Sequence, residues 1–405
     1  MSRPAVELTP EQVSDPIHGY TALREEGPLA RVVLPGTETP VWLATRYEDV
    51  KALTNDPRFV RDVSKLNLEG PNPHEEMVKA YGLPLEYREY LTSLVILDGP
   101  EHARMRSKVT RTFTVRRVNA LRAGVEETAD ELLNSLAGGE QFDLMHDFGY
   151  LLANRAICDL IGVERADQDQ MRTWILQYAF GSDPAECLAG LEGIIGYTKE
   201  LIKRRRAEPA DDIISTMIAD EDPTTDAEMV AMVILLINTG HTPPVTYLCE
   251  SLLTLLDHPD QLELLRSQPE LLPNAIHELL RYTTPVNIGA TVYATEDLEF
   301  AGVKISRGEA VTSALLAGNH DPDEFQKPEE LDISRAPKHG EHHVAFGGGA
   351  HYCLGAALGR MEAEVVFDRL LIKRDTLRLA VGRDELQFGA WPGEGNHLMS
   401  FPVRL

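Results

Sequence analysis

The sequence predicts a mainly α-helical protein with a small β-rich portion. Three observations support this fold class. The chain has 405 residues, so it should form two lobes or one large domain with an appended subdomain. Apolar residues recur at helical spacing from about residue 100 to residue 283. Alternation of apolar and polar residues, which is typical of strands, is confined to short stretches.

The individual elements follow from these patterns along the chain. Strand-like alternation is found near the N-terminus, at residues 29–35 and 40–46, and again at about residues 285–310 and 376–405. Residues 61–100 are rich in proline and glycine and predict an irregular connection. The clearest helical periodicity lies in residues 118–136, 229–240 and 248–268.

Composition limits the classes of partner and compartment. The chain is 43% hydrophobic and 25% charged, and it lacks a run of about 18 consecutive apolar residues, so we expect no membrane span. No secretory signal is visible in residues 1–30, so we expect a cytoplasmic protein. A formal net charge of −25 argues against nucleic-acid binding, because phosphate needs a basic surface.

Four cysteines, at positions 158, 187, 249 and 353, are too few for a disulfide framework, and none forms a C-x-x-C pair. Cys158 and Cys249 lie in apolar helical contexts and are expected to be small buried hydrophobic residues. Cys187 carries no signal.

Cys353 lies in a different setting, Phe346-Gly-Gly-Gly-Ala-His-Tyr-Cys-Leu-Gly355, which is followed by a helical run. Three consecutive glycines permit a tight backbone around a flat ligand, and they place the cysteine at the start of a helix. The helix dipole favours a thiolate there, and a thiolate is an axial ligand of haem iron in enzymes that cleave the O–O bond. The alternative is a glycine-rich turn with an incidental cysteine.

The stretch FGGGAHYCLGAALGR resembles the cysteine-ligand signature of bacterial cytochromes P450, with Gly359 in place of the more usual alanine. The resemblance extends over nearly the whole chain. It implies a cytochrome P450 fold in a single domain of residues 1–405, enclosing one haem b with Cys353 as the iron ligand. It also assigns contacts to the cofactor, at Phe346, Gly347, His351, Cys353 and Gly355.

Two further signatures of the family appear in the expected order. Glu278 and Arg281 share a helix face at i, i+3, and Arg335 follows in LDISRAP. The trio resembles the family's Glu-Arg-Arg network, which fixes the cysteine loop; the alternative is an ordinary surface pair. Residues 98–118 resemble the segment whose His and Arg hold the haem propionates, here His102 and Arg106, with His351 as a third contact.

The central helix departs from the family. Bacterial members usually carry Ala-Gly-x-Glu/Asp-Thr, whose acid and alcohol deliver protons during dioxygen activation; aligned on Gly240, this chain has Thr242 and Pro243 there. Pro243 and Pro244 lack the N–H that would bond to carbonyls one turn earlier, so a kink is expected. Alternatively, the prolines end the helix. The candidates for catalytic roles are Gly240, His241, Thr242 and Thr246, with ordered water and a substrate hydroxyl as alternative proton sources.

A basic segment suggests a redox partner. Residues 104–117 contain six basic side chains and no acidic one in an otherwise acidic protein. Such a surface would orient an acidic electron donor toward the haem; the alternative is a solvated helix face.

Together these features predict an oxidoreductase of the cytochrome P450 monooxygenase type. We expect it to activate dioxygen with electrons from ferredoxin and ferredoxin reductase, and to oxidise a bulky small molecule in secondary-metabolite biosynthesis as a cytoplasmic monomer. One alternative is an atypical member that forms intramolecular bonds or uses peroxide. Another is a haem-binding scaffold without turnover.

Overall fold

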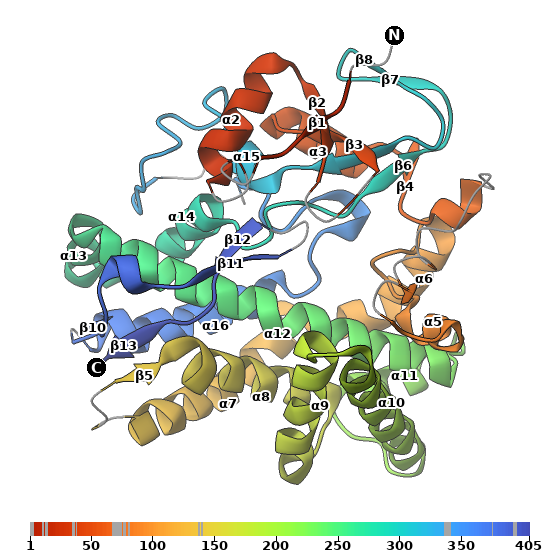
Figure 1. Cartoon of the computed structure of the whole chain (residues 1–405). Helices are drawn as coiled ribbons and strands as arrows, with labels where there is room; N and C mark the ends of the chain where they lie inside the picture. The colour runs from red at the N-terminus through yellow and green to blue at the C-terminus, as the bar shows by residue number, and fades with distance from the viewer. Residues whose placement is uncertain are drawn as a thin grey trace. The chain divides into compact units, whose positions relative to one another are not determined.

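The fold is given by a computed structural model that describes residues 4–9, 12, 15–34, 37, 39–66, 75, 78–79, 82–136, 138, 141–335, 342–374, 376–391 and 395–405. The chain divides into two units, which are taken one at a time below. The first unit comprises residues 1–61, 129–149 and 243–405, and the second comprises residues 62–128 and 150–242. Helices α7 (Val115–Leu136) and α12 (Asp226–Asp257) contribute residues to both units (Figure 1).

The largest sheet of the first unit has six strands in the order β1-β2-β3-β9-β6-β4. Strands β2 and β3 pair antiparallel, whereas β3 and β9 pair parallel. The sheet therefore joins the N-terminal strands to strands of the segment after residue 290. Its strands are β1 (Val6–Glu7), β2 (Leu29–Val33), β3 (Pro40–Ala44), β4 (Phe59–Val60), β6 (Val292–Ala294) and β9 (Ala310–Ser313).

Strand β3 explains how this sheet is buried on both faces. Successive side chains of a strand point to opposite faces. Val41 and Leu43 join one hydrophobic cluster, which includes Leu23 of α2 (Pro16–Glu26). Trp42 and Ala44 join another cluster, which includes Val50 of α3 (Tyr47–Asn55). Because both faces are covered, β3 is an almost continuous apolar run.

The rest of the first unit consists of helices and three small antiparallel sheets, β7-β8, β11-β12 and β10-β13-β5. Its remaining elements are β5 (Phe142–Asp143), a π-helix (Leu144–Gly149), α13 (Pro259–Ser267), α14 (Leu272–Thr283), β7 (Leu298–Phe300), β8 (Val303–Ile305), α15 (Leu315–Asn319), α16 (Ala356–Phe367), a second π-helix (Asp368–Ile372), β10 (Arg378–Leu379), β11 (Phe388–Trp391), β12 (Gly395–Leu398) and β13 (Pro402–Arg404), with short 3-10 turns between them.

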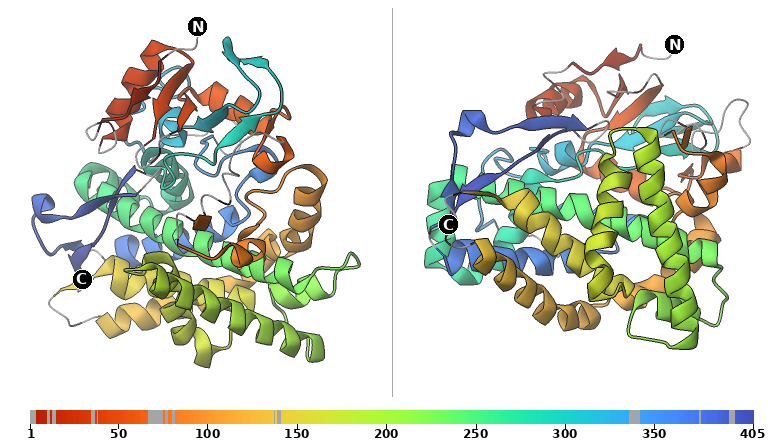
Figure 2. Two further views of the ribbon diagram at one scale, coloured as in Figure 1. Left: turned by 45° about the vertical axis from the view of Figure 1, so that its right-hand side comes forward. Right: turned by 60° about the horizontal axis from the view of Figure 1, so that its bottom comes forward.

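The second unit is helical over its described residues. Helices α8, α9 and α10 pack in sequence, and α11 packs against α6, α8 and α10 (Figure 2). Its helices are α5 (Arg88–Leu91), α6 (Gly99–Thr110), α8 (Tyr150–Ile161), α9 (Gln168–Phe180), α10 (Pro184–Ala207) and α11 (Ile213–Ile218), besides its parts of α7 and α12.

This arrangement confirms the predicted fold class, a mainly helical chain with short strands. Strands occur in all the stretches that the alternation predicted, and helices cover the periodic segments. Helix α12 is long and apolar enough to cross a membrane by length and composition alone, but 61% of its most apolar window is buried inside the structure. A core helix of a folded protein meets the same criterion, so this feature is weak evidence for a span.

Candidate functional site

The loop that carries Cys353, residues 346–355 and hereafter the cysteine loop, is held by backbone hydrogen bonds. The N–H of Cys353 donates to the carbonyl of Phe346 at 3.0 Å, and the N–H of Gly347 donates to the carbonyl of Val344 at 2.8 Å. Cys353 is exposed, and α16 begins three residues later. The structure thus places the cysteine at a helix start, as the sequence predicts.

Glycines are required in this loop for two reasons. Gly347 and Gly349 have φ angles of +67° and +63°, in the left-handed region that favours glycine. In addition, a Cβ on Gly348 would lie 2.6 Å from Oγ1 of Thr54, and one on Gly349 would lie 2.2 Å from its backbone oxygen. The loop therefore packs its backbone directly against the end of α3.

Aromatic contacts fix the side chain of Phe346. Its ring lies 5.8 Å from the ring of His343 and 6.2 Å from that of Tyr352, centroid to centroid. The guanidinium of Arg360, on α16, lies 5.4 Å from the Phe346 ring centroid, within cation–π range. Since the Phe346 carbonyl accepts the Cys353 N–H, these contacts also fix the position of the cysteine.

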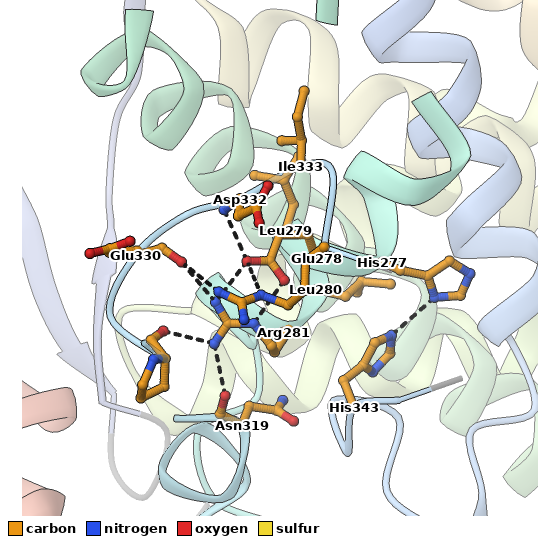
Figure 3. Close-up of polar contacts among 12 residues, drawn as sticks. His277, Glu278, Leu279, Leu280, Arg281, Asn319, Glu330, Asp332, Ile333 and His343 are labelled. Atoms are coloured by element: carbon orange, nitrogen blue, oxygen red, sulfur yellow. Dashed lines mark hydrogen bonds and ion pairs between the residues drawn. The ribbon is translucent and has the colours of Figure 1, made fainter. Parts of the chain in front are cut away.

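Glu278 is the centre of a buried ionic network in the same unit (Figure 3). Arg281 donates to both of its carboxylate oxygens at 2.8 Å, and Arg335 donates from Nε to Oε1 at 3.1 Å. The side chains of Glu278 and Arg281 are each 2% exposed, so the alternative of an ordinary surface pair is wrong. A buried pair of this kind depends on complete hydrogen bonding, which the second arginine and the Asp332 N–H supply.

Asn319 links this network to the cysteine loop. Its backbone carbonyl accepts from Nη1 of Arg281 at 2.9 Å, and its side-chain oxygen accepts from the N–H of Val344 at 2.8 Å. Val344 in turn accepts the N–H of Gly347. The network therefore supports the loop through three consecutive hydrogen bonds, which is a structural role.

The cysteine loop fits a thiolate-ligated haem. Its thiol is exposed beside a helix start, whereas burial raises the pKa of the Cys158 thiol to about 12 and raises that of Cys249 well above its usual range. A Cβ on Gly347 would meet nothing within 4 Å, and Gly355 has only the Cys353 sulfur at that distance. The loop can thus lie against a flat ligand without obstruction on this side.

The residues expected to hold the propionates lie in both units. His102 and Arg106 are on α6 at i, i+4, and the His102 side chain is buried. His351 belongs to the cysteine loop, in the first unit. Their contacts with a cofactor stay a prediction.

Helix α12 runs without a break from Asp226 to Asp257, and Pro243 and Pro244 lie inside it. The alternative in which these prolines end the helix is therefore wrong. The kink stays a prediction.

The threonine hydroxyls of α12 differ in their hydrogen bonding. Thr242 and Thr246 share a helix face, and no hydrogen bond involves either hydroxyl in the described chain. The Thr239 hydroxyl, by contrast, donates to the Leu235 carbonyl at 2.8 Å.

His241 occupies a different environment from these threonines. Its side chain is 1% exposed and stacks on Tyr150 of α8, with ring centroids 4.6 Å apart and planes at 26°. Burial, with a smaller contribution from the charge of Arg172, lowers the pKa of His241 to about 4. Neighbouring Gly240 packs against α8 as well, where a Cβ would lie 2.9 Å from Ile157. The structure therefore places Gly240 and His241 against α8.

The basic segment is less positive than its sequence indicates. Arg104 pairs with Glu228, the 1% exposed Lys108 pairs with Asp220 and Asp222, and Arg117 pairs with Asp211. These acids come from a distant part of the chain, which a local count of charges does not include. Arg111 and Arg116 are exposed and form no ion pair within the described residues, so they carry the remaining positive surface.

Two polar features of the structure have no distinct signal in the sequence. The imidazole of His277, next to Glu278, lies within hydrogen-bond distance of His343, with 3.3 Å between Nδ1 and Nε2. Arg172, on α9, has its Nε–H buried without a hydrogen-bond partner among the described residues. His277 and Arg172 lie in helical segments without a motif around them, so only tertiary packing reveals these features.

Comparison with known proteins gives the family that the chain resembles. The family model described as Cytochrome P450 matches residues 134–374 of the chain. The vitamin D(3) 25-hydroxylase of Pseudonocardia autotrophica is 37% identical over 378 residues, which are 92% of this chain and 90% of that protein.

Solved structures agree. The structure of the bacillaene polyketide synthase cytochrome P450 PksS of Bacillus subtilis 168 superimposes with a TM-score of 0.86 at 32% identity, covering 98% of this chain and 99% of that one. The cytochrome P450 CxnD, described as an enzyme for C–S bond formation in chuangxinmycin biosynthesis, gives a TM-score of 0.83 at 28% identity, covering 100% and 98%.

Proposed function

The chain belongs to the cytochrome P450 family and is an oxidoreductase of the monooxygenase type, and we propose that it uses one haem b bound through Cys353 to oxidise a bulky small molecule. The observation that carries the proposal is the exposed thiol of Cys353, which the Phe346 carbonyl and the Glu278 network hold at the start of α16. The relatives named polyketide biosynthesis cytochrome P450 PksS and mycinamicin IV hydroxylase/epoxidase support a role in secondary-metabolite biosynthesis.

In this proposal the parts of the site have defined tasks. A haem bound through the Cys353 thiolate would supply reductive activation of dioxygen. The start of α16 stabilises the negative charge of the Cys353 sulfur through its free N–H groups and dipole. The cysteine loop and the Glu278 network fix the sulfur in place, and His102, Arg106 and His351 would hold the carboxylates of the cofactor.

Proton supply is assigned to the Thr242 and Thr246 hydroxyls of α12. The two hydroxyls lie one turn apart on a single helix face. A hydroxyl that lacks a fixed hydrogen-bond partner can pass on a proton from water. His241 is not assigned this role, because its ring is buried and burial lowers its pKa to about 4.

Electrons come from a ferredoxin and its reductase. Arg111 and Arg116 are exposed and form no ion pair in the described chain, so they provide a small positive surface on an acidic protein, which suits an acidic donor. We further infer a cytoplasmic monomer.

Turnover tests this function and separates it from its alternatives. The purified protein is supplied with dioxygen, NADPH, ferredoxin reductase and ferredoxin, or with hydrogen peroxide alone, and a small-molecule library is searched for product by mass spectrometry. Product with ferredoxin is expected. Product with peroxide alone identifies a peroxide-using enzyme, and a haem-loaded protein that binds ligands without forming product with either identifies a scaffold.

A second candidate function is intramolecular bond formation. The observation that favours it is the presence of Pro243 and Pro244 inside the continuous helix α12. Pro243 stands in the place of the usual alcohol, and each proline removes one helical hydrogen bond, at a cost of about 3 kcal/mol or more. The relative CxnD shows that this fold is used for bond formation.

The double variant Thr242→Glu with Pro243→Thr separates the two functions. If the enzyme forms bonds, an added acid–alcohol pair should divert flux, lowering the amount of product per reducing equivalent. If it carries out ordinary hydroxylation, that ratio should stay the same or rise. Mass spectrometry of products and consumption of NADPH give both quantities.

A further inference from the structure

Arg172 is an unusual cation for this protein. Its Nε–H is buried without a hydrogen-bond partner, and its guanidinium forms no ion pair in the described chain, although acidic residues outnumber basic ones by 64 to 39. Other arginines of the same unit, such as Arg104 and Arg205, are paired with carboxylates. An unpaired guanidinium with a buried N–H therefore calls for a ligand.

His241 is unpartnered in the same region of the second unit. Both of its ring nitrogens are buried and lack a hydrogen-bond partner among the residues described. The ring is 1% exposed, and the stack on Tyr150 fixes its plane. A buried polar atom without a hydrogen-bond partner is destabilising, so three such atoms on two side chains call for a ligand or water that satisfies them.

The charges around the two side chains indicate the sign of the ligand. Arg172 is close enough for its positive charge to act on the His241 imidazole, and no carboxylate contributes to that environment. The imidazole itself is neutral near neutral pH, because burial lowers its pKa to about 4. The site thus holds one net positive charge and N–H donors from both side chains.

From this arrangement we propose that Arg172 and His241 form a binding site for a carboxylate, between helices α8, α9 and α12. A monoanion neutralises the single guanidinium charge, whereas a phosphate dianion would leave an excess negative charge in a buried place. The two oxygens of a carboxylate can accept one hydrogen bond from the guanidinium and one from the imidazole N–H. The site lies wholly in residues 150–242 and does not depend on haem chemistry.

The carboxylate can belong to the substrate or to a separate small acid. Binding of a carboxylate, from either source, is tested first on the haem-loaded full-length protein. Sodium acetate is the probe and acetamide is the uncharged control, both at constant ionic strength. Acetate should raise the unfolding midpoint in a saturable way, and acetamide should not. No saturable effect of acetate would overturn the proposal, and an equal effect of chloride would show that the site has no preference for a carboxylate.

Variants locate the effect. Arg172→Gln should abolish the saturable stabilisation, and His241→Leu should weaken acetate binding about tenfold, because one hydrogen bond to a charged group is lost. Arg378→Gln is the matched control, since Arg378 is exposed and donates to the carbonyl of Thr376. Equal acetate binding by Arg172→Gln and wild type would overturn the proposal. Should Arg172→Gln fail to fold, Arg172→Lys keeps the charge and should still weaken binding.

A second pair of probes identifies the source of the carboxylate. Dodecanoate and its methyl ester are compared by the shift they cause in haem absorbance. If dodecanoate shifts the haem absorbance and this shift is lost in Arg172→Gln, the carboxylate belongs to the substrate. If dodecanoate and its methyl ester cause the same shift while the wild-type protein still binds acetate, the carboxylate belongs to a separate small acid. The ferrous carbon monoxide spectrum is recorded for each protein, so that a failure of the haem-thiolate function is distinguished from a failure of this site.

Discussion

Arg335 donates from Nε to Oε1 of Glu278 at 3.1 Å, across 57 residues of sequence. With Arg281 on the same carboxylate, this contact completes a buried network that supports the cysteine loop through Asn319. The site therefore depends on residues that make no contact with the cysteine itself.

Removal of Glu278 should cost stability before it costs chemistry. Glu278→Ala leaves two arginines without their shared carboxylate, one of them fully buried, and should lower the free energy of unfolding by about 3–5 kcal/mol and reduce haem retention. Glu200→Ala is the control: it breaks an exposed i, i+3 pair with Lys203 and should cost less than about 1 kcal/mol. Urea unfolding measures both; a haem-loaded Glu278→Ala protein with wild-type stability would contradict the network's role.

Two glycine substitutions should have opposite effects. Gly349→Ala forces a left-handed residue to carry a side chain, at a cost of about 1–2 kcal/mol, and drives its Cβ into the Thr54 carbonyl. Gly359→Ala, inside α16 with nothing within 4 Å of the new Cβ, should stabilise by about 0.5–1 kcal/mol. Thermal unfolding and haem content of the two variants check this; equal effects would show that loop geometry is not the constraint.

The buried imidazole of His241 should make the protein sensitive to acid. Its pKa falls from 6.5 in the unfolded chain to about 4 in the folded one, so the unfolded chain binds more protons in this window. Stability therefore rises with pH through the window and is lost as pH falls, at up to about 1.4 kcal/mol per pH unit.

His241→Leu should reduce the slope of the unfolding free energy against pH by the contribution of one titrating group. In a buffer free of carboxylates, it should leave the unfolding free energy at pH 7 unchanged or higher. The reason is that the ring nitrogens have no partner to lose in the described chain. Unfolding free energies at several pH values measure the slope; a slope identical to that of wild type would show that His241 is not the titrating group.

Reversal of the free positive charges should weaken the electron donor's binding. The double variant Arg111→Glu with Arg116→Glu should raise the KM for ferredoxin about tenfold at low ionic strength, and the difference should shrink as salt increases. Arg117→Gln is the control, because Asp211 already compensates Arg117. Steady-state reduction kinetics decide this, and a KM unaffected by the double variant would place the donor elsewhere.

Much of the fold was predictable because its signals are local. The glycine run before Cys353, the periodicity of α7 and α12, and the alternation in β2 and β3 each follow from the geometry of one element. Glu278 and Arg281 were predictable as a pair for the same reason, since they share a helix face.

What the sequence did not reveal depends on tertiary contacts. Lys108 belongs to a run of basic residues, yet Asp220 and Asp222 neutralise it more than a hundred positions later. The burial of His241 and its stacking on Tyr150 come from the packing of α12 against α8, which no pattern around residue 241 predicts. The hydrogen bond between His277 and His343 likewise joins residues that no local pattern associates.

The central claim is that Cys353 supplies the thiolate ligand of the haem iron, and the ferrous carbon monoxide absorption spectrum tests it most directly. Wild type and Cys187→Ala, which removes a partly buried cysteine of α10, should both show the red-shifted band of a thiolate-ligated haem, and Cys353→Ala should lack it. A Cys353→Ala protein that retained that band would contradict the assignment.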